Sequence, residues 1–482
     1  MTDASPDSLD REAVQAFIDE LWEAEIVPEL ERYIAIPCKS PAFDPDWEAN
    51  GHMEAAVQQI AAWCRARPIP GLELEIVRLE GRTPLIFMEI PGTAGPEGDT
   101  VLLYGHLDKQ PEMTGWRDDL GPWLPVRQEN RLYGRGGADD GYAAYASLTA
   151  LEALHRFGGV HGRAVVLIEA SEESGSPDLP YYIDALAERI GPVDLVVCLD
   201  AGAGNYGQLW STTSLRGIAG GTLDVEILEE GVHSGDASGI VASSFRILRA
   251  LLSRLEDEAT GRIHLDSANA AVPEARVAQA RVAAQQLGDT VYRKFPFVSG
   301  AEPMGDDLAE LILNRTWRPA LSVTGQAGLP DLASAGNVLR PSTSVVLSLR
   351  LPPTADPDRV NADMTALLGR DVPYGARVSV DFGHAAAGWH APVLAPWLEA
   401  ATEAASRARF GRPACYMGEG GSIPFMGLLG EKFPQAQFLI TGVLGPQSNA
   451  HGPNEFLEIA YAKKLNAAVA DILMAHALRP RG

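Results

Sequence analysis

The sequence predicts an α/β protein, in which a mixed sheet with helices on both faces is interrupted by a smaller inserted α+β domain. Apolar runs typical of buried strands alternate with helical runs as far as Asp200. From about Arg216 the strand-like runs alternate apolar and polar residues, which indicates a sheet with one more open face. We therefore expect 1–215 and 393–482 to form one domain and 216–392 to be inserted into it.

Helical and strand-like runs follow one another along the first part of the chain. Apolar residues recur at helical spacing over 8–35 and 50–66, and an Ala- and Leu-rich helix that ends at a glycine is expected over 140–158. The strand-like runs lie at 72–79, 84–90, 100–108, 163–173 and 193–202. In sheets of this kind functional groups gather beyond the carboxyl ends of the strands, so polar residues there are the first candidates for a site.

The inserted part has its own alternation of strands and helices. Its strand-like runs are 221–230, 342–353 and 376–384, and its helical runs are 242–260 and 356–369. The segment 383–396 looks like the linker out of this domain. A helix over 397–411 and a C-terminal helix from about Glu458 return to the composition of the first part.

Composition and charge exclude several classes of protein. With 46% hydrophobic residues, the 482-residue chain can bury a large core. Its formal net charge, 39 − 64 = −25, makes nucleic acid an unfavourable partner. The four cysteines form no CxxC pair, which argues against structural zinc and a disulfide framework. The N-terminus has no signal-peptide pattern and no apolar run is long enough to span a bilayer, so we expect a cytoplasmic protein without a membrane partner.

Side chains that suit a metal ion follow several of the predicted strands. They are His106 and Asp108, Asp139 and Asp140, Glu172 and Glu173, Asp200, and His451. Taken singly, each is weak: a lone histidine is more often structural, and the acids fit helix N-caps or loops. Together they are harder to dismiss, because clustered carboxylates repel one another without a cation. Imidazole and carboxylate ligands suit zinc, manganese or cobalt.

The order of these motifs resembles a known family. The motifs GHLD, LYGRGGADDG, EASEESGS, LDAG, EGVHSGDASG and AHGPNE resemble the di-metal peptidase family of carboxypeptidase G, acetylornithine deacetylase, succinyl-diaminopimelate desuccinylase and aminoacylase. The resemblance covers essentially the whole chain. WRPALSVTG, SLRLPP and GEGGSIPF look most like its carnosine and cytosolic non-specific dipeptidase branch. It implies that the inserted domain is ferredoxin-like and serves as a dimerisation or lid domain.

The resemblance also implies two metal ions per subunit, with zinc expected first and manganese or cobalt as alternatives. His106 and Asp200 would bind one ion, Glu173 and His451 the other, and Asp139 would bridge them.

Two further carboxylates take other roles by the same resemblance. Asp108 would orient His106, and Glu172 would be the general base for a water activated by the two metal ions. The sequence departs from the family at DDGYAAY, where the lysine that usually follows the paired acids is missing.

His233 lies in the glycine-rich GVHSGDASG loop of the inserted domain. From the residues alone, a turn histidine and a functional histidine fit equally well. The resemblance implies that His233 reaches across a homodimer interface and stabilises the oxyanion of the tetrahedral intermediate.

Several groups of the inserted domain and the following segment could read the ends of a substrate. Arg350 could pair with a substrate carboxylate, with a surface arginine as the alternative, and Asn337 is a weaker candidate nearby. In GEGGSIPF, Gly420, Gly421 and Ser422 offer hydrogen-bond donors for a carboxylate, and Glu419 could meet an ammonium group.

We therefore expect a metal-dependent hydrolase that cleaves the amide bond of dipeptides or short peptides. The alternative is an N-acyl amino acid deacylase that uses the same metal centre. A metal-bound protein without catalysis is a third hypothesis, which Glu172 argues against because binding alone needs no general base.

Overall fold

The computed structural model describes residues 9–94, 99–422 and 424–479, and these divide into two compact units. The first unit comprises Met1–Thr212, Ala391–Tyr416 and Leu428–Gly482, and the second comprises Thr213–His390 and Met417–Gly427. Residues 417–427 thus cluster with the second unit, although the sequence placed them in the last segment of the first domain. Within the described residues, no helix has both the length and the apolar character that a membrane span needs.

A six-stranded mixed sheet forms the centre of the first unit. Its strands, in the order β1-β2-β6-β3-β7-β17, are β1 (Glu73–Val77), β2 (Leu85–Ile90), β6 (Arg163–Glu169), β3 (Thr100–His106), β7 (Leu195–Cys198) and β17 (Gln437–Ile440). Strands β6, β3, β7 and β17 are parallel, whereas β1 and β2 are antiparallel to their neighbours. Every residue of β3 is buried, as expected for a central parallel strand covered on both faces. The predicted mixed α/β sheet is thereby confirmed.

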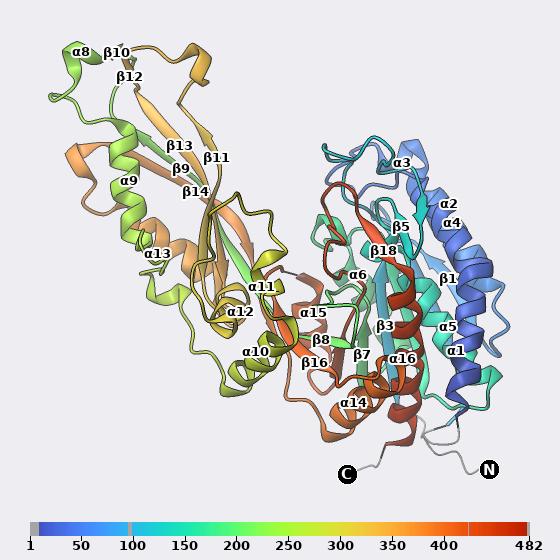
Figure 1. Ribbon diagram of the computed structural model, residues 1–482. Coiled ribbons are helices and arrows are strands. Elements are labelled where there is room, and N and C mark those ends of the chain that lie inside the picture. Colours follow the sequence, from blue (N-terminus) through green and yellow to red (C-terminus); the bar gives the residue numbers. More distant parts are fainter. Residues whose placement is uncertain (1–8, 95–98, 423, 480–482) are drawn as a thin grey trace. The chain divides into compact units, whose positions relative to one another are not determined.

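Helices of the first unit pack beside this sheet (Figure 1). They are α1 (Arg11–Leu21), a π-helical turn (Trp22–Ile26), α2 (Val27–Ile34), α3 (Trp47–Asn50), α4 (His52–Arg65), α5 (Ala143–Arg156), α6 (Leu179–Ala185), α7 (Ala187–Ile190), α14 (Pro396–Phe410) and α16 (Ile459–Leu478). Helix α15 (Pro424–Lys432) begins in the segment that clusters with the second unit and ends in the first. Helix α16 packs against α1, α5 and α14. The Trp22 indole donates to the buried Asn466 Oδ1 at 2.9 Å, which joins the two ends of the chain.

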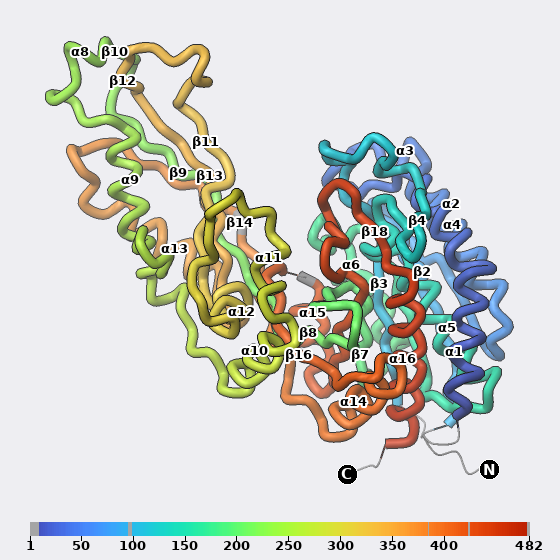
Figure 2. The backbone as a smooth tube through the Cα atoms, in the orientation of Figure 1, coloured from blue at the N-terminus to red at the C-terminus, as the bar shows by residue number. Residues whose placement is uncertain are grey.

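Short strands complete the first unit. A three-stranded sheet has the order β18-β5-β4, with β18 (Phe456–Glu458), β5 (Arg131–Tyr133) and β4 (Val126–Gln128). In Figure 2 the red segment of β18 lies beside the cyan segment of β4 and β5. This pairing brings the chain that follows His451 next to the chain that precedes Asp139.

The second unit contains a four-stranded antiparallel sheet with two helices. The sheet order is β11-β13-β9-β14, with β9 (Gly217–Glu226), β11 (Ala320–Ala327), β13 (Ser342–Leu351) and β14 (Arg377–Ala386). Helix α9 (Ser244–Leu255) follows β9, and α13 (Pro357–Gly369) follows β13. The chain order β-α-β-β-α-β with this sheet order is the ferredoxin-like arrangement. Its core is apolar and includes Leu223, Ile247, Leu347 and Met364.

Further elements decorate this unit. They are β10 (Val232–His233), α8 (Ser234–Ala237), α10 (Glu274–Leu287), α11 (Thr290–Arg293), α12 (Leu308–Thr316), β12 (Val338–Leu339) and β15 (Trp389–His390). Strand β15 forms a three-stranded sheet with β8 (Trp210–Leu215) and β16 (Cys415–Glu419). The predicted linker 383–396 is wrong in its first half, because strand pairing with β9 continues β14 to Ala386 and β15 follows.

Candidate metal centre

The candidate ligands lie where the central strands of the first unit end. Strand β3 ends at His106, and its neighbours β6 and β7 end at Glu169 and Cys198. Because these strands are parallel neighbours, the loops that follow them emerge at the same edge of the sheet.

A first group consists of His106, Asp139 and Asp200, all of which are buried. One ligand atom from each lies within 4.8 Å of the other two. His106 Nε2 is 3.3 Å from Asp139 Oδ1 and 3.8 Å from Asp200 Oδ2.

A second group consists of Asp139, Glu173 and His451, with the same mutual limit of 4.8 Å. His451 Nε2 is 3.1 Å from Asp139 Oδ2 and 3.3 Å from Glu173 Oε2. Asp139 belongs to both groups and turns one carboxylate oxygen toward each histidine. The structure therefore brings all five predicted metal ligands together, in the grouping that the sequence prediction gave them.

Asp108 connects the end of β3 to the Glu172–Glu173 turn. Its two carboxylate oxygens accept the backbone N–H groups of Glu172 and Glu173 at 3.1 and 3.0 Å. His106 Nδ1 lies 3.1 Å from the backbone carbonyl of Asp108 and 3.5 Å from its carboxylate. The Asp108 side chain thus positions the paired glutamates more directly than it positions His106. The chain then turns at Gly175, whose φ is +86°.

The carboxyl groups of the two glutamates in this cluster are buried and lie close to other carboxylates. Burial raises the pKa of Glu172 well above its ordinary value, and the charge of Asp200 raises it further. Burial and then Asp139 raise the pKa of Glu173 in the same way. Burial opposes the protonation of His106, yet hydrogen bonds to Asp108 and Asp139 outweigh it and raise the pKa of that imidazole.

The residues present fit a pair of divalent cations. Two imidazoles and three carboxylates are a donor set that suits zinc, manganese or cobalt. A cation would also relieve the repulsion that raises the pKa values of the two glutamates. Glu172 belongs to neither ligand group among the residues that the structure describes.

Asp140 braces the backbone at the end of β3. It is fully buried, and its Oδ2 accepts the backbone N–H of His106 at 3.3 Å. Gly105 makes this contact possible, because a Cβ atom there would lie 2.7 Å from Asp140 Oδ2 and 2.4 Å from Ala143 Cβ. Asp140 is not a member of either ligand group.

Sequence reasoning missed a buried ion pair that holds the His451 loop. Arg135 Nη1 donates to Glu455 Oε2 at 2.5 Å, and Arg135 Nη2 donates to the Gly452 carbonyl at 2.7 Å. Glu455 Oε1 accepts the backbone N–H of Gly136 at 2.9 Å. The signal was present, since Arg135 and Glu455 stand inside the same two motifs as Asp139 and His451. The backbone of His451 has a φ of +63°, a conformation that the surrounding structure must enforce.

Lys109 was missed as well. It is fully buried, and its Nζ donates to the carbonyls of Tyr33 at 2.7 Å and Ile36 at 2.8 Å. It therefore ties the chain after β3 to the end of α2. A Cβ atom at Gly136 would lie 2.6 Å from Lys109 Cε, so the loop that leads to Asp139 packs directly on this lysine.

The second unit holds the remaining candidates in two places. Arg350 on β13 donates to Ser422 Oγ at 3.2 Å, and Ser422 Oγ donates to the Arg216 carbonyl at 2.7 Å. Arg216 Nε donates to the Gly420 carbonyl at 3.2 Å. The structure thus brings Arg350 together with the loop that contains Glu419, Gly420, Gly421 and Ser422.

His233 and Asn337 lie together elsewhere in the second unit, at the β10–β12 pair. The backbone N–H of Ser234 donates to the Asn337 carbonyl at 2.9 Å, and His233 is exposed. His233 Nδ1 accepts the backbone N–H of Gly235 at 3.1 Å. Because Nδ1 is used as an acceptor, the neutral imidazole carries its proton on Nε2 and can donate from there.

Comparisons with known proteins agree with this geometry. The chain is 28% identical over 450 residues to the cysteinylglycine-S-conjugate dipeptidase of Corynebacterium striatum, which covers 91% of this chain and 92% of that relative. It is 28% identical over 294 residues to the human Beta-Ala-His dipeptidase, covering 58% of this chain and 55% of the relative.

Solved structures share the fold. The dipeptidase Dug1p from Saccharomyces cerevisiae superposes with a TM-score of 0.76 at 22% identity, covering 98% of this chain and 99% of that chain. Human carnosine dipeptidase 1 gives the same TM-score and identity, with 97% and 99% covered. The model of peptidase family M20/M25/M40 matches residues 102–475, which is most of the sequence. The chain therefore belongs to peptidase family M20/M25/M40.

Proposed function

We propose that this protein is a metallodipeptidase that hydrolyses the amide bond of dipeptides or short peptides at a centre with two divalent ions. The observation that carries the proposal is the position of Asp139, which turns one carboxylate oxygen toward His106 and the other toward His451. His106, Asp139 and Asp200 would hold one ion, and Asp139, Glu173 and His451 the other. Bound there, the ions would polarise the scissile carbonyl and acidify the attacking water.

Glu172 is the general base of the proposed reaction. Asp108 fixes its backbone N–H, and its neighbour Glu173 belongs to a ligand group while Glu172 belongs to none. A carboxylate that holds no ion is free to take up a proton. The Glu172 carboxylate takes the proton of the attacking water and then delivers it to the leaving amine, so that one proton crosses between the two groups in each turnover.

The ends of the substrate would be read by the second unit. Arg350 and Ser422 are in contact, and a guanidinium beside a hydroxyl suits a carboxylate. The backbone N–H groups of Gly420 and Gly421 lie in the same loop, and Glu419 offers a negative charge to the substrate ammonium. Asn337 supplies a further polar group beside His233.

His233 would act from a second copy of the chain. The Nε2–H of this exposed imidazole is a donor suited to a developing oxyanion. Apolar side chains on the chain segments that flank the β10–β12 pair also face solvent: Ile240 is 86% exposed and Leu332 is 97% exposed. Such residues are typical of a surface that another protein covers, and we assign it to a homodimer.

A substrate panel tests the proposal against the deacylase alternative. The names of the relatives, dipeptidases for cysteinylglycine conjugates and Beta-Ala-His, favour peptides with a free amino group. The protein loaded with zinc, manganese or cobalt is incubated with a panel of dipeptides and a panel of N-acyl amino acids, and the released amino acids are quantified. Cleavage of the dipeptides is expected. Cleavage confined to the N-acyl compounds would remove the dipeptidase assignment.

A further inference from the structure

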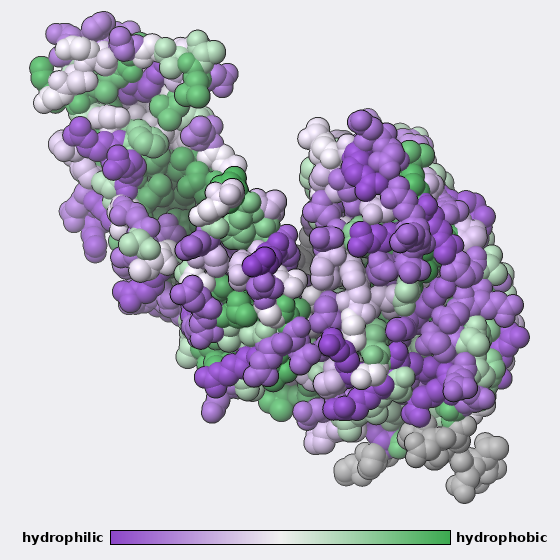
Figure 3. Space-filling view, in the orientation of Figure 1, coloured by the Kyte–Doolittle hydropathy of each residue, from purple (hydrophilic) through white to green (hydrophobic). Residues whose placement is uncertain are grey.

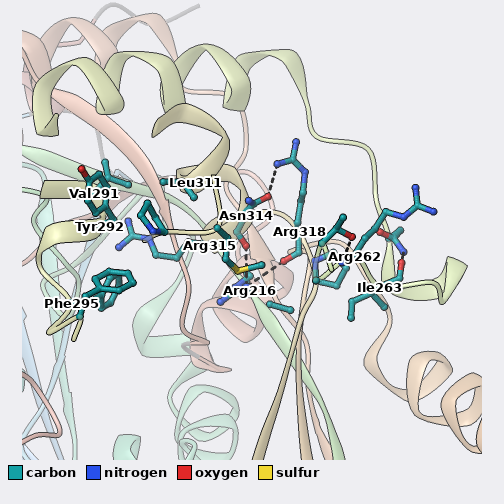
Figure 4. A pocket seen from close by; sticks show the side chains of 18 residues that line it. Arg216, Arg262, Ile263, Val291, Tyr292, Phe295, Leu311, Asn314, Arg315 and Arg318 are labelled. Atoms are coloured by element: carbon teal, nitrogen blue, oxygen red, sulfur yellow. Dashed lines mark hydrogen bonds between the residues drawn. The ribbon is translucent and has the colours of Figure 1, made fainter. Parts of the chain in front are cut away.

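The second unit contains a cavity that no step of the proposed reaction uses. Its volume is about 380 Å³, within the range of about 300–1,000 Å³ that is usual for small-molecule sites. Figure 4 shows its lining, which comes from the segment 260–269, the region of α11 and α12, and Arg216. We call it the arginine–aromatic cavity, after Arg216, Arg315, Tyr292 and Phe295.

One wall of the cavity is apolar and open to solvent. Phe295 is 50% exposed, and Met304 is 76% exposed. Large apolar side chains rarely gather at the surface of a protein unless they contact a ligand or a partner. In Figure 3 hydrophobic residues lie among hydrophilic ones on the visible face over α10–α12. The wall therefore fits a bulky apolar group.

The cavity also has a cationic wall, formed by Arg216 and Arg315, and the negative charge of Glu419 lies near Arg315. The Arg216 guanidinium donates to the backbone carbonyls of Gly420, Asn314 and Arg318. Arg315 Nη2 donates to Met417 Sδ at 3.3 Å. Burial lowers the pKa of Arg216 to about 10, and the nearby charges of Arg350 and Arg315 act in the same direction. An anion at this wall would offset that mutual repulsion.

The cationic wall is continuous with the loop assigned to the substrate carboxylate. Arg216 joins the two, because its side chain lines the cavity while its carbonyl accepts from Ser422 Oγ at 2.7 Å. Arg315 lines the cavity too and contacts Met417, which precedes that loop. A ligand whose carboxylate lies at Arg350 and Ser422 could thus place an adjoining apolar group in the cavity.

We propose that the arginine–aromatic cavity receives the side chain of the C-terminal residue of the substrate, and that it selects bulky apolar residues such as phenylalanine or leucine. The proposal rests on the proposed peptidase function and adds to it the class of residue released as the free amino acid. Arg350 and Ser422 select the residue that bears the free carboxylate, and the apolar wall of the cavity selects its side chain.

The test compares Phe295→Ala with a matched control. Val282→Ala truncates an apolar side chain of α10 that is 48% exposed and does not line the cavity. For wild type and both variants, kcat/KM is measured with Gly-Phe, Gly-Gly and Phe-Gly. We expect wild type to prefer Gly-Phe over Gly-Gly by about ten-fold or more. Phe295→Ala should lower kcat/KM for Gly-Phe about ten-fold and change the value for Gly-Gly less than about two-fold, whereas Val282→Ala should resemble wild type.

Several outcomes would overturn the proposal. Equal kcat/KM for Gly-Phe and Gly-Gly in wild type would do so, and so would a Phe295→Ala effect confined to Phe-Gly, which would assign the cavity to the N-terminal residue. Calorimetry with free L-phenylalanine and with glycine tests ligand binding in the cavity without any peptide cleavage. If wild type binds L-phenylalanine more tightly than glycine and Phe295→Ala abolishes this difference, the cavity assignment is supported. If no peptide is cleaved as well, only the peptidase function is removed. Equal L-phenylalanine binding by wild type and Phe295→Ala would overturn the cavity assignment.

Discussion

At the scale of single residues, the candidate centre depends on the directions in which a few oxygen atoms point. Asp139 reaches both histidines only because its two oxygens diverge, at 3.3 Å from His106 and 3.1 Å from His451. Asp108 accepts two successive backbone N–H groups and so fixes the position of the Glu172–Glu173 backbone. A ligand set and a base can then occupy adjacent positions without competing for the same ion.

Replacing Asp108 by asparagine should weaken metal binding while leaving the fold intact. The amide keeps one acceptor oxygen but presents an N–H₂ group to one of the two backbone N–H donors. We expect the affinity for the weaker-bound ion to fall by about 10–100-fold, the usual effect of losing a partner behind the ligands. Metal affinity is measured by competition with a chelator. Asp118→Asn, at an exposed position of the same loop region, is the control and should leave the affinity unchanged. Unchanged affinity in Asp108→Asn would contradict the assigned role.

At the scale of elements, two loops from distant parts of the chain are fastened together by one buried ion pair. Arg135 precedes Asp139, Glu455 follows His451, and the two side chains are almost completely buried. Burial raises the pKa of Glu455 to about 7, and the Arg135 charge opposes that rise. The pair also has hydrogen bonds to the backbone of both loops, so its loss would free His451 from Asp139.

Glu455→Gln should therefore remove one of the two ions that we propose for the site. Breaking one partner of a buried ion pair typically costs about 3–5 kcal/mol, part of which falls on the loop conformation rather than on global unfolding. Metal analysis after gel filtration should give about one ion per chain in place of two. Glu458→Gln removes an acid from the half-exposed Arg131 pair on neighbouring strands and should keep both ions. Two ions in Glu455→Gln would show that the pair does not position His451.

The candidate ligands could be singled out from the sequence because several of them follow apolar strands whose ends must meet. His106, Glu173 and Asp200 follow β3, β6 and β7, and adjacency of these strands follows from the alternation of strands and helices. The ion pair of Arg135 with Glu455 spans 320 residues, and no local pattern relates the two positions. The arginine–aromatic cavity was not foreseen either, because its lining joins residues of α11 and α12 to Arg216 and the segment 260–263, and no local pattern relates these positions.

At the scale of the whole molecule, the proposal needs two copies of the chain. The candidate metal ligands and Glu172 belong to the first unit, and His233 belongs to the second. If His233 acts on the site of a partner copy, each site combines residues from two chains, as a two-fold symmetric dimer permits.

Mixing two inactive variants tests this directly. Glu172→Gln and His233→Ala should each be nearly inactive. In a mixed dimer, the His233→Ala chain supplies Glu172 to one site and the Glu172→Gln chain supplies His233 to the same site, which is then complete. Equimolar mixing with subunit exchange should restore about a quarter of wild-type activity, since half of the dimers are mixed and each has one complete site. The restored activity is measured as the rate of dipeptide hydrolysis. A mixture as inactive as its components would rule out action across the dimer.

The central claim is that Glu172 moves the proton at a centre with two metal ions, and Glu172→Gln tests it most directly. The substitution keeps the size of the side chain and leaves both ligand groups complete. Metal content and dipeptide turnover are measured on the same preparation. The account predicts two ions per chain with kcat reduced by about 10²–10⁴-fold, the usual contribution of a general base. A variant that keeps both ions and turns over dipeptides at a near-normal rate would contradict it.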